Sequence, residues 1–398
     1  MNGSLKFAAP LALTLAVAAC SGAGSPSLPN AGQPLAGNGG VPLWQATHAA
    51  HRACPGSRTN QMQCDALIQD GVRPDVAGLG PADFQAAYGL PSSSKGAGQI
   101  VAIVDAFDNP NVASDLATYR SYFGLGKAKF KKFNQEGQQG PYPKGNPNWG
   151  VEIDLDVEMV SASCPKCTIY LIESKNNSGR SLYAAVQEAV KLGAHVVSNS
   201  WGGGGGTPSR NAFNTPGVAY LASSGDGGYG MQDPADYDTV IAVGGTLLSK
   251  TSSGYTERVW PDSGAGCSVV AKPSWQSDPS CTQRTGNDVA AVAMNAAEYD
   301  SYGSGGGWFT VGGTSVSSPL IAGVFGLAGN ASKQDGGKSF WRLSKSKLQK
   351  DLHYISSGNV VNCPSSLGGT YLCQAGTNQF GSYSGPVGWG TPNGIGAF

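Results

Sequence analysis

The sequence carries little charge. Only 13% of its 398 residues are charged, and 26 basic side chains balance 26 acidic ones. A zero net charge argues against a nucleic-acid-binding surface, which needs a basic patch. After the first residues, no apolar run reaches the length needed to span a membrane. The glycine run at 202–206 is not followed by Gly-Lys-Ser/Thr, so a phosphate-binding loop is not expected there.

Residues 1–19 have the features of an export signal. Lys6 is followed by an apolar stretch that ends in small residues. The four residues Val17-Ala18-Ala19-Cys20 resemble a bacterial lipobox, which predicts a lipid on Cys20; ordinary cleavage after Ala18 or Ala19 is the alternative. Residues 20–45 are rich in Gly, Ser, Pro and Ala, a composition typical of a flexible tether. We therefore expect an exported protein of the cell envelope, held at the outer membrane or cell surface by its lipid, or otherwise secreted.

Cysteines support export. The sequence has nine, and without Cys20 the remaining eight fall into four pairs of neighbours, which suits disulfides in an oxidising compartment. Pairing between neighbours is the simplest choice, although spacing does not fix the connectivity. The expected bridges are Cys54–Cys64, Cys164–Cys167, Cys267–Cys281 and Cys363–Cys373. The first of them would close a short lead-in at residues 46–78.

From residue 79 onward, strand-like and helix-like segments alternate. Short apolar runs at 99–105, 168–172, 195–198, 218–223 and 239–243 are typical of buried strands, and 112–123 and 181–191 are helix-like. Alternation of this kind predicts an α/β fold with a mostly parallel central sheet and helices on both faces. Active sites of such folds lie beyond the carboxyl ends of the strands. The loops at that edge include 105–108, 199–206 and 224–227.

The segment Gly312-Gly313-Thr314-Ser315-Val316-Ser317-Ser318-Pro319 is the strongest candidate for chemistry. Two glycines permit a sharp turn, and a helix is expected from Ser315 to about Ala328. A hydroxyl at the positive end of a helix suits a nucleophile that develops negative charge. A Gly-Thr-Ser helix cap without any catalytic role would look the same.

Acids alternate with apolar residues at 151–159. This period favours a half-buried strand, in which Glu152 and Asp156 would be about 13 Å apart. In a helix the same two residues would have Cβ atoms about 6 Å apart, close enough to share a proton. From these residues alone, a solvated acidic face is expected. A third acid, Asp226, follows a predicted strand and is flanked by small residues that leave room for a substrate backbone.

Together these segments resemble the sedolisins, or serine-carboxyl peptidases, from about residue 80 to the end. The resemblance rests on Gly-Gly-Thr-Ser-x-x-x-Pro at 312–319, Glu-x-x-x-Asp at 152–156, Ser-Ser-Gly-Asp-x-Gly at 223–228, and flanking matches at 242–246 and 388–393. It implies a subtilisin-like fold with a peptidase domain at 79–398, in which residues 151–162 form a helix despite their period. It also implies that Ser315 is the nucleophile, Glu152 the base, Asp156 its supporting acid and Asp226 the oxyanion donor. The expected activity is hydrolysis of proteins or peptides in acid.

The sequence departs from the family in two places. Sedolisins usually carry a long prosegment, whereas a short stretch at 21–78 stands in its place here, so zymogen control is in doubt and this stretch is expected to stay attached. Aspartates of the family's calcium site align with Tyr354 and Ser384, so no metal or other cofactor is expected.

We expect a monomer that binds no nucleic acid. Two other functions stay open. A surface-binding lipoprotein could keep this fold without turnover. A subtilisin-type neutral protease would need a catalytic histidine, but none of His48, His51, His195 and His353 is followed by the Gly-Thr of that family. Asp105 ends the first strand, where the aspartate of a subtilisin triad would lie, but it has no histidine to support. We therefore interpret it as structural or cleft-lining.

Overall fold

The computed structural model describes residues 50–54, 61–73, 78–203, 210–303 and 306–398. The predicted signal and tether at 1–45, with Cys20, lie outside these ranges. Within them, every helix is too short or too polar to cross a membrane.

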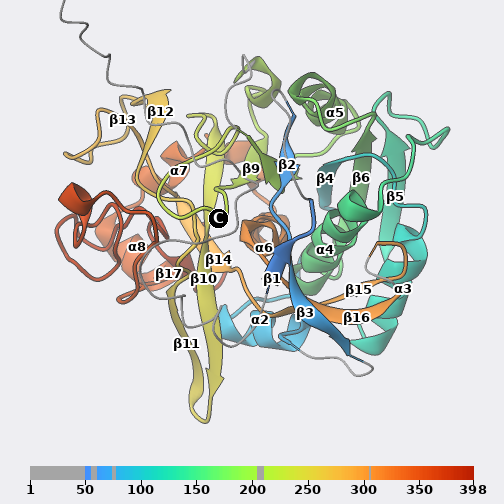
Figure 1. Cartoon of the computed structure of the whole chain (residues 1–398), viewed down its shortest axis with the longest axis horizontal. Helices are drawn as coiled ribbons and strands as arrows, with labels where there is room; N and C mark the ends of the chain where they lie inside the picture. Colours follow the sequence, from blue (N-terminus) through green and yellow to red (C-terminus); the bar gives the residue numbers. More distant parts are fainter. Residues whose placement is uncertain (1–49, 55–60, 74–77, 204–209, 304–305) are drawn as a thin grey trace, which may run out of the picture.

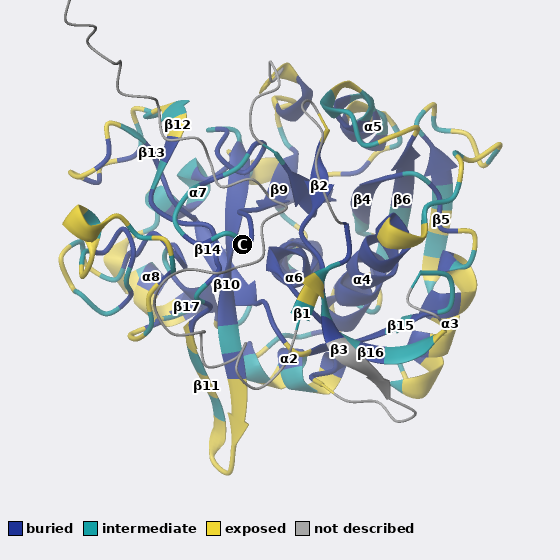
Figure 2. Ribbon diagram, in the orientation of Figure 1, coloured by how far each residue is buried: buried dark blue, intermediate teal, exposed yellow. Residues whose placement is uncertain are grey.

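The centre of the molecule is a mostly parallel sheet of eight strands, as predicted (Figure 1). Its order is β11-β10-β9-β7-β4-β6-β5, with β14 paired to β10, and only β11 runs antiparallel to its neighbour. The strands are β4 (Ile100–Ala106), β5 (Lys129–Asn134), β6 (Thr168–Ser174), β7 (Val196–Asn199), β9 (Ala219–Ser223), β10 (Val240–Thr251), β11 (Gly254–Val259) and β14 (Val289–Val292). Strand β10 is much longer than the predicted 239–243, because its second half leaves the core and pairs with β11 as an exposed hairpin (Figure 2).

Helices connect and cover these strands. They are α2 (Pro81–Ala87), α3 (Val112–Tyr122), α4 (Pro147–Ser163), α5 (Gly179–Lys191), α6 (Thr314–Ala328), α7 (Lys338–Trp341) and α8 (Lys345–Asp351). Helices α4 and α6 pack against each other, and α5 packs against β4 and β6. Almost every residue of α4 and α6 is buried (Figure 2). These two helices therefore form the centre of the core, where a polar side chain has almost no access to water.

The prediction of a strand over 151–159 is wrong, and the helix implied by the resemblance is correct. Asn146 caps α4 by accepting hydrogen bonds from the backbone N–H groups of Asn148 and Trp149, and Pro147 occupies the first turn. Residues two apart on a helix point to opposite sides, whereas residues four apart share a side. The period of two thus arises from acids on opposite sides of one helix that is buried all round.

The described residues 50–54 and 61–73 contribute strands that pack on the same core. A second sheet has the order β1-β3-β16-β15, and β2 pairs with β8. These strands are β1 (Ala50–Arg52), β2 (Gln63–Cys64), β3 (Leu67–Arg73), β8 (Trp201–Gly202), β15 (Ala296–Asp300) and β16 (Gly307–Gly312). The smaller pairs are β12 (Cys267–Ala271) with β13 (Gln283–Thr285), and β17 (Leu352–His353) with β18 (Thr391–Pro392). The lead-in is thus held by two separate strand pairings with the rest of the molecule.

All four predicted disulfides are present. They join Cys54 to Cys64, Cys164 to Cys167, Cys267 to Cys281, and Cys363 to Cys373. Four bridges between neighbours in the sequence fit a protein that folds after export.

Removing the Cys267–Cys281 bridge tests how much such a bridge stabilises the fold. The two residues are 14 positions apart, so in the chain-entropy model the bridge stabilises the folded state by about 3 kcal/mol. We expect Cys267→Ser with Cys281→Ser to lower the free energy of unfolding by that amount in a urea titration. A loss below about 1 kcal/mol would mean that the β12–β13 hairpin is already constrained in the unfolded chain.

Candidate active site

Ser315 lies in the first turn of α6, directly after β16 and a glycine turn. Gly313 has φ 109°, and a Cβ atom at this position would lie 1.8 Å from the carbonyl oxygen of Asp65. Only glycine fits this turn, because both the backbone angle and the close approach exclude a side chain. Ser315 is 0% exposed, and its hydroxyl lies 3.3 Å from the carbonyl oxygen of Ser200. The start of the helix thus places a hydroxyl oxygen next to backbone N–H groups that carry partial positive charge, an arrangement that suits a nucleophile.

Glu152 and Asp156 are one turn apart on α4, and both are 0% exposed. This position overturns the expectation of a solvated acidic face. Asp156 accepts a hydrogen bond of 2.7 Å from the hydroxyl of Ser200, which fixes the orientation of its carboxyl group. Neither oxygen of Glu152 makes a well-formed hydrogen bond within the described residues. Glu152 is therefore a buried carboxyl group that has room to accept a proton.

The pKa of Glu152 lies well above its ordinary value. Burial is the main cause, and the nearby carboxyl groups of Asp156 and Asp105 raise it further, whereas the hydroxyl of Ser315 lowers it as a hydrogen-bond donor. Burial and the charge of Asp105 likewise raise the pKa of Asp156, against the hydrogen bond from Ser200. Groups that interact this strongly titrate as a pair, so the raised pKa values belong to the dyad rather than to either residue alone.

Asp105 is buried beside this dyad. Both of its oxygens lack hydrogen-bond partners among the described residues, and burial raises its pKa to about 8. Its carboxyl group is therefore neutral in acid and influences Glu152 and Asp156 through its charge only at higher pH. Of the two roles expected for Asp105, full burial favours the structural one over the cleft-lining one.

Asp226 follows β9 and faces the start of α6. Its Oδ1 accepts hydrogen bonds of 2.8 Å from both the backbone N–H and the hydroxyl of Thr314, the residue before Ser315. Its Oδ2 is buried and has no partner among the described residues. Burial raises the pKa of Asp226 to about 6, while the charge of Arg52 and the hydrogen bonds from Thr314 lower it. In acid the free oxygen can thus hold a proton and donate it in a hydrogen bond.

Ser200 joins these groups, although no pattern of residues singles it out from the loop at 199–206. Its hydroxyl donates to Asp156, and its carbonyl oxygen lies near both Ser315 Oγ and the backbone N–H of Asp65. The only signal in the sequence is its position after β7, at the carboxyl edge of the sheet.

Arg52 and Asp65 of the lead-in also reach the site, and sequence reasoning missed both. Arg52 donates a hydrogen bond of 3.2 Å to the carbonyl oxygen of Asp226. Asp65 is 2% exposed, and burial together with the charge of Asp226 raises its pKa to about 8. No pattern in residues 46–78 marks them, because only the pairing of β2 with β8 and of β3 with β16 brings this segment to the site.

Histidines occupy other positions. His195 is exposed before β7 with its Nδ1 at 3.0 Å from the carbonyl oxygen of Gly217, and His353 pairs with Thr391 between β17 and β18. His51 lies on β1, and His48 is outside the described ranges. The described surroundings of Ser315 are thus carboxyl and hydroxyl groups, which is unlike a Ser-His-Asp triad.

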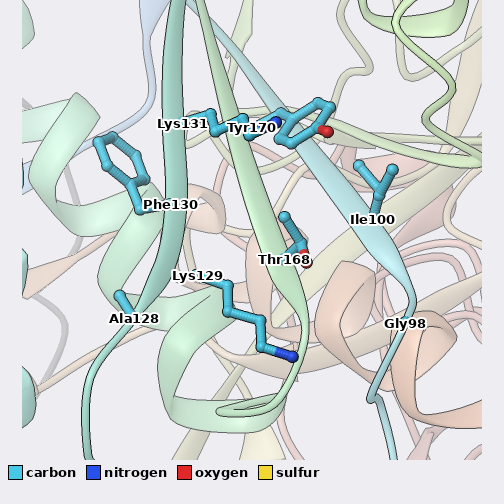
Figure 3. Close-up of a pocket in the computed structure, with 8 residues that line it drawn as sticks. All are labelled: Gly98, Ile100, Ala128, Lys129, Phe130, Lys131, Thr168 and Tyr170. Atoms are coloured by element: carbon cyan, nitrogen blue, oxygen red, sulfur yellow. The ribbon is translucent and has the colours of Figure 1, made fainter.

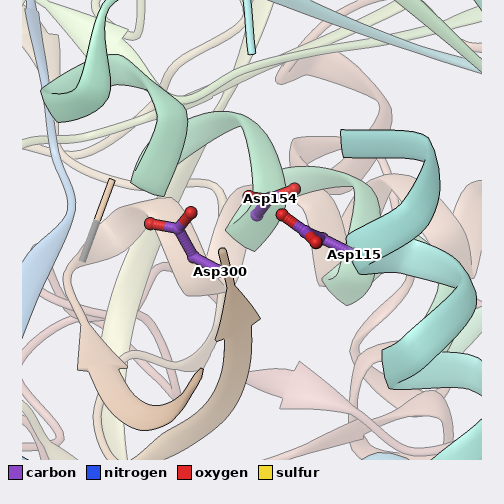
Figure 4. A group of neighbouring side chains, drawn as sticks. All are labelled: Asp115, Asp154 and Asp300. Carbon is purple, nitrogen blue, oxygen red and sulfur yellow. The ribbon is translucent and has the colours of Figure 1, made fainter. Parts of the chain in front are cut away.

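A second group of buried acids lies on the opposite side of α4. Carboxyl oxygens of Asp115, Asp154 and Asp300 all lie within 4.8 Å of one another, a spacing that could hold a cation or shared protons (Figure 4). Donors already surround them, since Asn109 donates to Asp154 at 2.6 Å and Ser301 donates to Asp115 at 2.7 Å. Because these donors join α3, α4 and the turn after β15, we assign the cluster a structural role.

The positions of the family's calcium aspartates offer no carboxylate here. Tyr354 is exposed and its hydroxyl donates to Asn378 at 3.1 Å, while Ser384 is buried in a turn that ends at Gly388. A hard cation such as Ca²⁺ prefers several charged oxygen ligands, which these two side chains do not supply.

An open hollow lies at the other edge of the sheet. It is lined by Ile100, Lys129, Thr168 and neighbouring residues at the amino ends of β4, β5 and β6 (Figure 3). Binding sites of parallel sheets lie at the carboxyl ends of the strands, so this hollow is separate from the candidate site.

Comparisons with known proteins agree with this geometry. The family model described as "Subtilase family" matches residues 88–360. Kumamolisin of Bacillus sp. (strain MN-32) is 31% identical over 283 residues, which cover 61% of this chain and 50% of that protein. Sedolisin of Pseudomonas sp. (strain 101) is 28% identical over 364 residues, which cover 79% of this chain and 60% of that protein. The chain thus spans about half the length of the curated relatives it matches.

Solved structures show the same fold. Pseudomonas sedolisin, a serine-carboxyl proteinase solved with two molecules of pseudo-iodotyrostatin, superposes with a TM-score of 0.68 and 26% identity, over 80% of this chain and 96% of that one. A psychrophilic protease of 16% identity superposes with a TM-score of 0.52, a likeness of fold alone. The chain therefore belongs to the subtilase family and, within it, to the sedolisins.

Proposed function

We propose that this protein hydrolyses peptide bonds in acid as a serine-carboxyl peptidase. Ser315 is the nucleophile, Glu152 its base, Asp156 the supporting acid and Asp226 the oxyanion donor. The observation that carries the proposal is the position of Ser315, which is buried at the start of α6 between a carboxyl dyad and a carboxyl group bonded to Thr314.

The proposed reaction begins with transfer of a proton. As Ser315 Oγ attacks the carbonyl carbon of the scissile bond, its proton passes to Glu152. Asp156 takes part of the resulting change in charge, because the two carboxyl groups titrate as a pair and Ser200 holds Asp156 in place. The same proton then goes to the leaving amine, and water repeats the sequence on the acyl-enzyme.

Asp226 stabilises the negative oxygen of the tetrahedral intermediate. Its Oδ1 is fixed by Thr314, so a proton on Oδ2 points into the site without further reorganisation. This donor is present only below the pKa of Asp226, which is about 6. Because the mechanism needs this proton, we propose that the enzyme is active at acidic pH. The proposed mechanism uses no cofactor.

Labelling of Ser315 with a peptide aldehyde tests the proposal. The adduct carries an oxygen in the position of the oxyanion, so labelling of Ser315 should rise as the pH falls through about 6. An Asp226→Asn variant keeps a donor at every pH and should show a flatter profile. Mass spectrometry of the labelled peptide provides the measurement. Failure to label Ser315 at any pH would favour a binding protein that keeps the fold without turnover, an alternative suggested by the full burial of Ser315 in this structure.

We further propose that the substrates are proteins or peptides met outside the cell by a monomeric, lipid-anchored enzyme. The four disulfides fit an exported protein. Attachment through a lipid on Cys20 rests on the sequence alone, because that residue lies outside the described ranges.

A further inference from the structure

The lead-in crosses the candidate site as an added strand. In β2, Gln63 lies opposite Gly202 and Cys64 opposite Trp201, in antiparallel register with β8. The next residue, Asp65, donates its backbone N–H to the carbonyl oxygen of Ser200 at 3.2 Å. Addition of an extended segment to an exposed strand is a common way for a protein to bind a peptide. Here the bound segment belongs to the chain itself, and the Cys54–Cys64 disulfide ties it to the residues just after β1.

The backbone of Asp65 lies at the reacting groups. Its N–H and the hydroxyl of Ser315 both approach the carbonyl oxygen of Ser200, at 3.2 and 3.3 Å. A Cβ atom placed on Gly313 would lie 1.8 Å from the Asp65 carbonyl oxygen and 2.7 Å from Oδ2 of Asp226. The carbonyl oxygen of Asp65 and the partnerless oxygen of Asp226 thus border the same point, where an oxyanion donor is expected. By this geometry Asp65 occupies the position of the residue before a scissile bond.

The side chain of Asp65 fills a pocket of hydrogen-bond donors. Its Oδ2 accepts a hydrogen bond of 2.6 Å from the hydroxyl of Ser223 and another from Nε2 of Gln232. The side chain of Gln232 is confined, because a Cβ atom on Gly202 would lie 2.2 Å from its Cδ and one on Gly225 would lie 3.2 Å from it. Strands β8 and β9, with Gln232, therefore build a small, buried pocket that presents an amide and a hydroxyl.

We propose that this pocket selects aspartate, or the isosteric asparagine, as the residue before the scissile bond of peptide substrates. The selection rests on the proposed peptidase function and names its substrate class. A side-chain oxygen at the length of Asp65 accepts from Ser223 and Gln232, whereas alanine leaves both donors unpaired and lysine adds a cation without an acceptor. A site built to hydrogen-bond a polar group rejects analogues that lack it more strongly than an apolar site rejects a change in size. Aspartate and asparagine are equivalent at acidic pH, because the pKa of Asp65 is raised to about 8 and its carboxyl group is neutral there.

The first test uses the full chain in a Ser315→Ala background, which prevents cleavage. Amide hydrogen exchange at residues 61–66 is measured by mass spectrometry with Asp65 replaced by asparagine or by lysine. We expect Asp65→Asn to keep the protection of the parent, and Asp65→Lys to lose at least about tenfold, since two hydrogen bonds to the pocket disappear. The matched control is Asp335→Lys at an exposed position, which should leave the exchange of residues 61–66 unchanged. Equal protection in the parent and in Asp65→Lys would overturn the proposal.

The second test measures directly which residue the enzyme prefers before the scissile bond. The active Asp65→Lys chain, with its own segment displaced, digests a mixed peptide library at about pH 4, and the residue before each cut is counted. Aspartate and asparagine should be enriched at least about tenfold over alanine and lysine. Adding Gln232→Leu should remove most of this enrichment, whereas Gln187→Leu on the exposed side of α5 should keep it. Cleavage without such enrichment would overturn the proposal. If no variant cleaves and Ser315 is not labelled, the proposed function fails, and the exchange experiment alone decides what the pocket binds.

Discussion

Replacement of Ser315 by alanine is expected to abolish acylation and peptide cleavage. The hydroxyl is the group that forms the acyl-enzyme in the proposed mechanism, and without it no acyl-enzyme is made for water to hydrolyse. Cleavage of a fluorogenic peptide at about pH 4, at equal concentrations of parent and variant, provides the measurement. The helix start should tolerate the change, because Ser315 bonds only weakly to Ser200, at 3.3 Å. An unchanged melting temperature would show that lost activity comes from lost chemistry.

Glu152→Gln is expected to lower turnover by about a hundredfold to ten-thousandfold, the usual contribution of a general base. Glutamine keeps the shape of the side chain but cannot take the proton of Ser315. Glu158→Gln is the matched control, because Glu158 is equally buried on α4 yet accepts its hydrogen bond from the backbone of Tyr299, away from the nucleophile. A protein that cleaves best above neutral pH and is indifferent to Glu152→Gln would contradict the mechanism even if Ser315 proved essential.

The folded state is expected to be most stable in mild acid and to lose stability as the pH rises toward 8. Burial raises the pKa of several carboxyl groups far above the value near 4 that they have in an unfolded chain. Among them are Asp226 at about 6, Asp262 at about 7, Asp65, Asp105 and Asp236 at about 8, and Glu173 at about 9.

The sign follows from proton counts. Between about pH 4 and these raised values, the folded state holds protons that the unfolded state has released. Each such group therefore stabilises the fold fully below about pH 4, and its contribution falls by about 1.4 kcal/mol for each pH unit as the pH rises through the folded pKa. The lowered pKa values of Asp83 and Asp278 act in the opposite direction, and that stabilisation is lost only as the pH falls below about 4. The maximum should thus lie at about pH 4 to 5.

Thermal unfolding of Ser315→Ala, which cannot digest itself, tests this expectation. We expect the melting temperature to fall by more than about 10 °C between about pH 4.5 and pH 8, because several protons are lost together. Asp105→Asn should flatten the profile at its alkaline end, since an amide in the same place needs no proton. Asp335→Asn on the surface should leave the profile unchanged, because exposed ion pairs contribute little. A melting temperature that is flat or rises over this range would mean that the buried acids are compensated in another way.

Local patterns in the sequence predicted the parts of the molecule that depend on neighbours along the chain. The short apolar runs became β4, β6, β7 and β9, and the helix after Gly313 became α6. All four disulfides join cysteines close in sequence, so proximity along the chain was sufficient to pair them. Apolar composition indicates the buried strands, and short separation along the chain indicates the disulfides. Both features can be read from the residues themselves.

Helix α4 shows where local pattern fails. An alternation of acids and apolar residues is ordinarily a sign of a strand with one wet face. Here tertiary packing buries all sides of a helix, with Glu152 and Asp156 toward Ser315 and Asp154 toward Asp115 and Asp300. The cost of burying these acids is reduced by protonation, which the raised pKa values favour, and by hydrogen bonds from other elements, which no window of sequence contains.

The sequence by itself determined the fold class, the disulfides and the identity of the candidate groups Ser315, Glu152, Asp156 and Asp226, because each rests on short-range pattern or on resemblance. Only the tertiary structure decided what surrounds them. It brings Asp65 and Ser200 together across 135 residues through one backbone hydrogen bond, and places a pocket of Ser223 and Gln232 around a lead-in side chain. Strand pairing between distant segments carries this information, and its register is set by the whole core, so no local pattern reveals which residue will face the nucleophile.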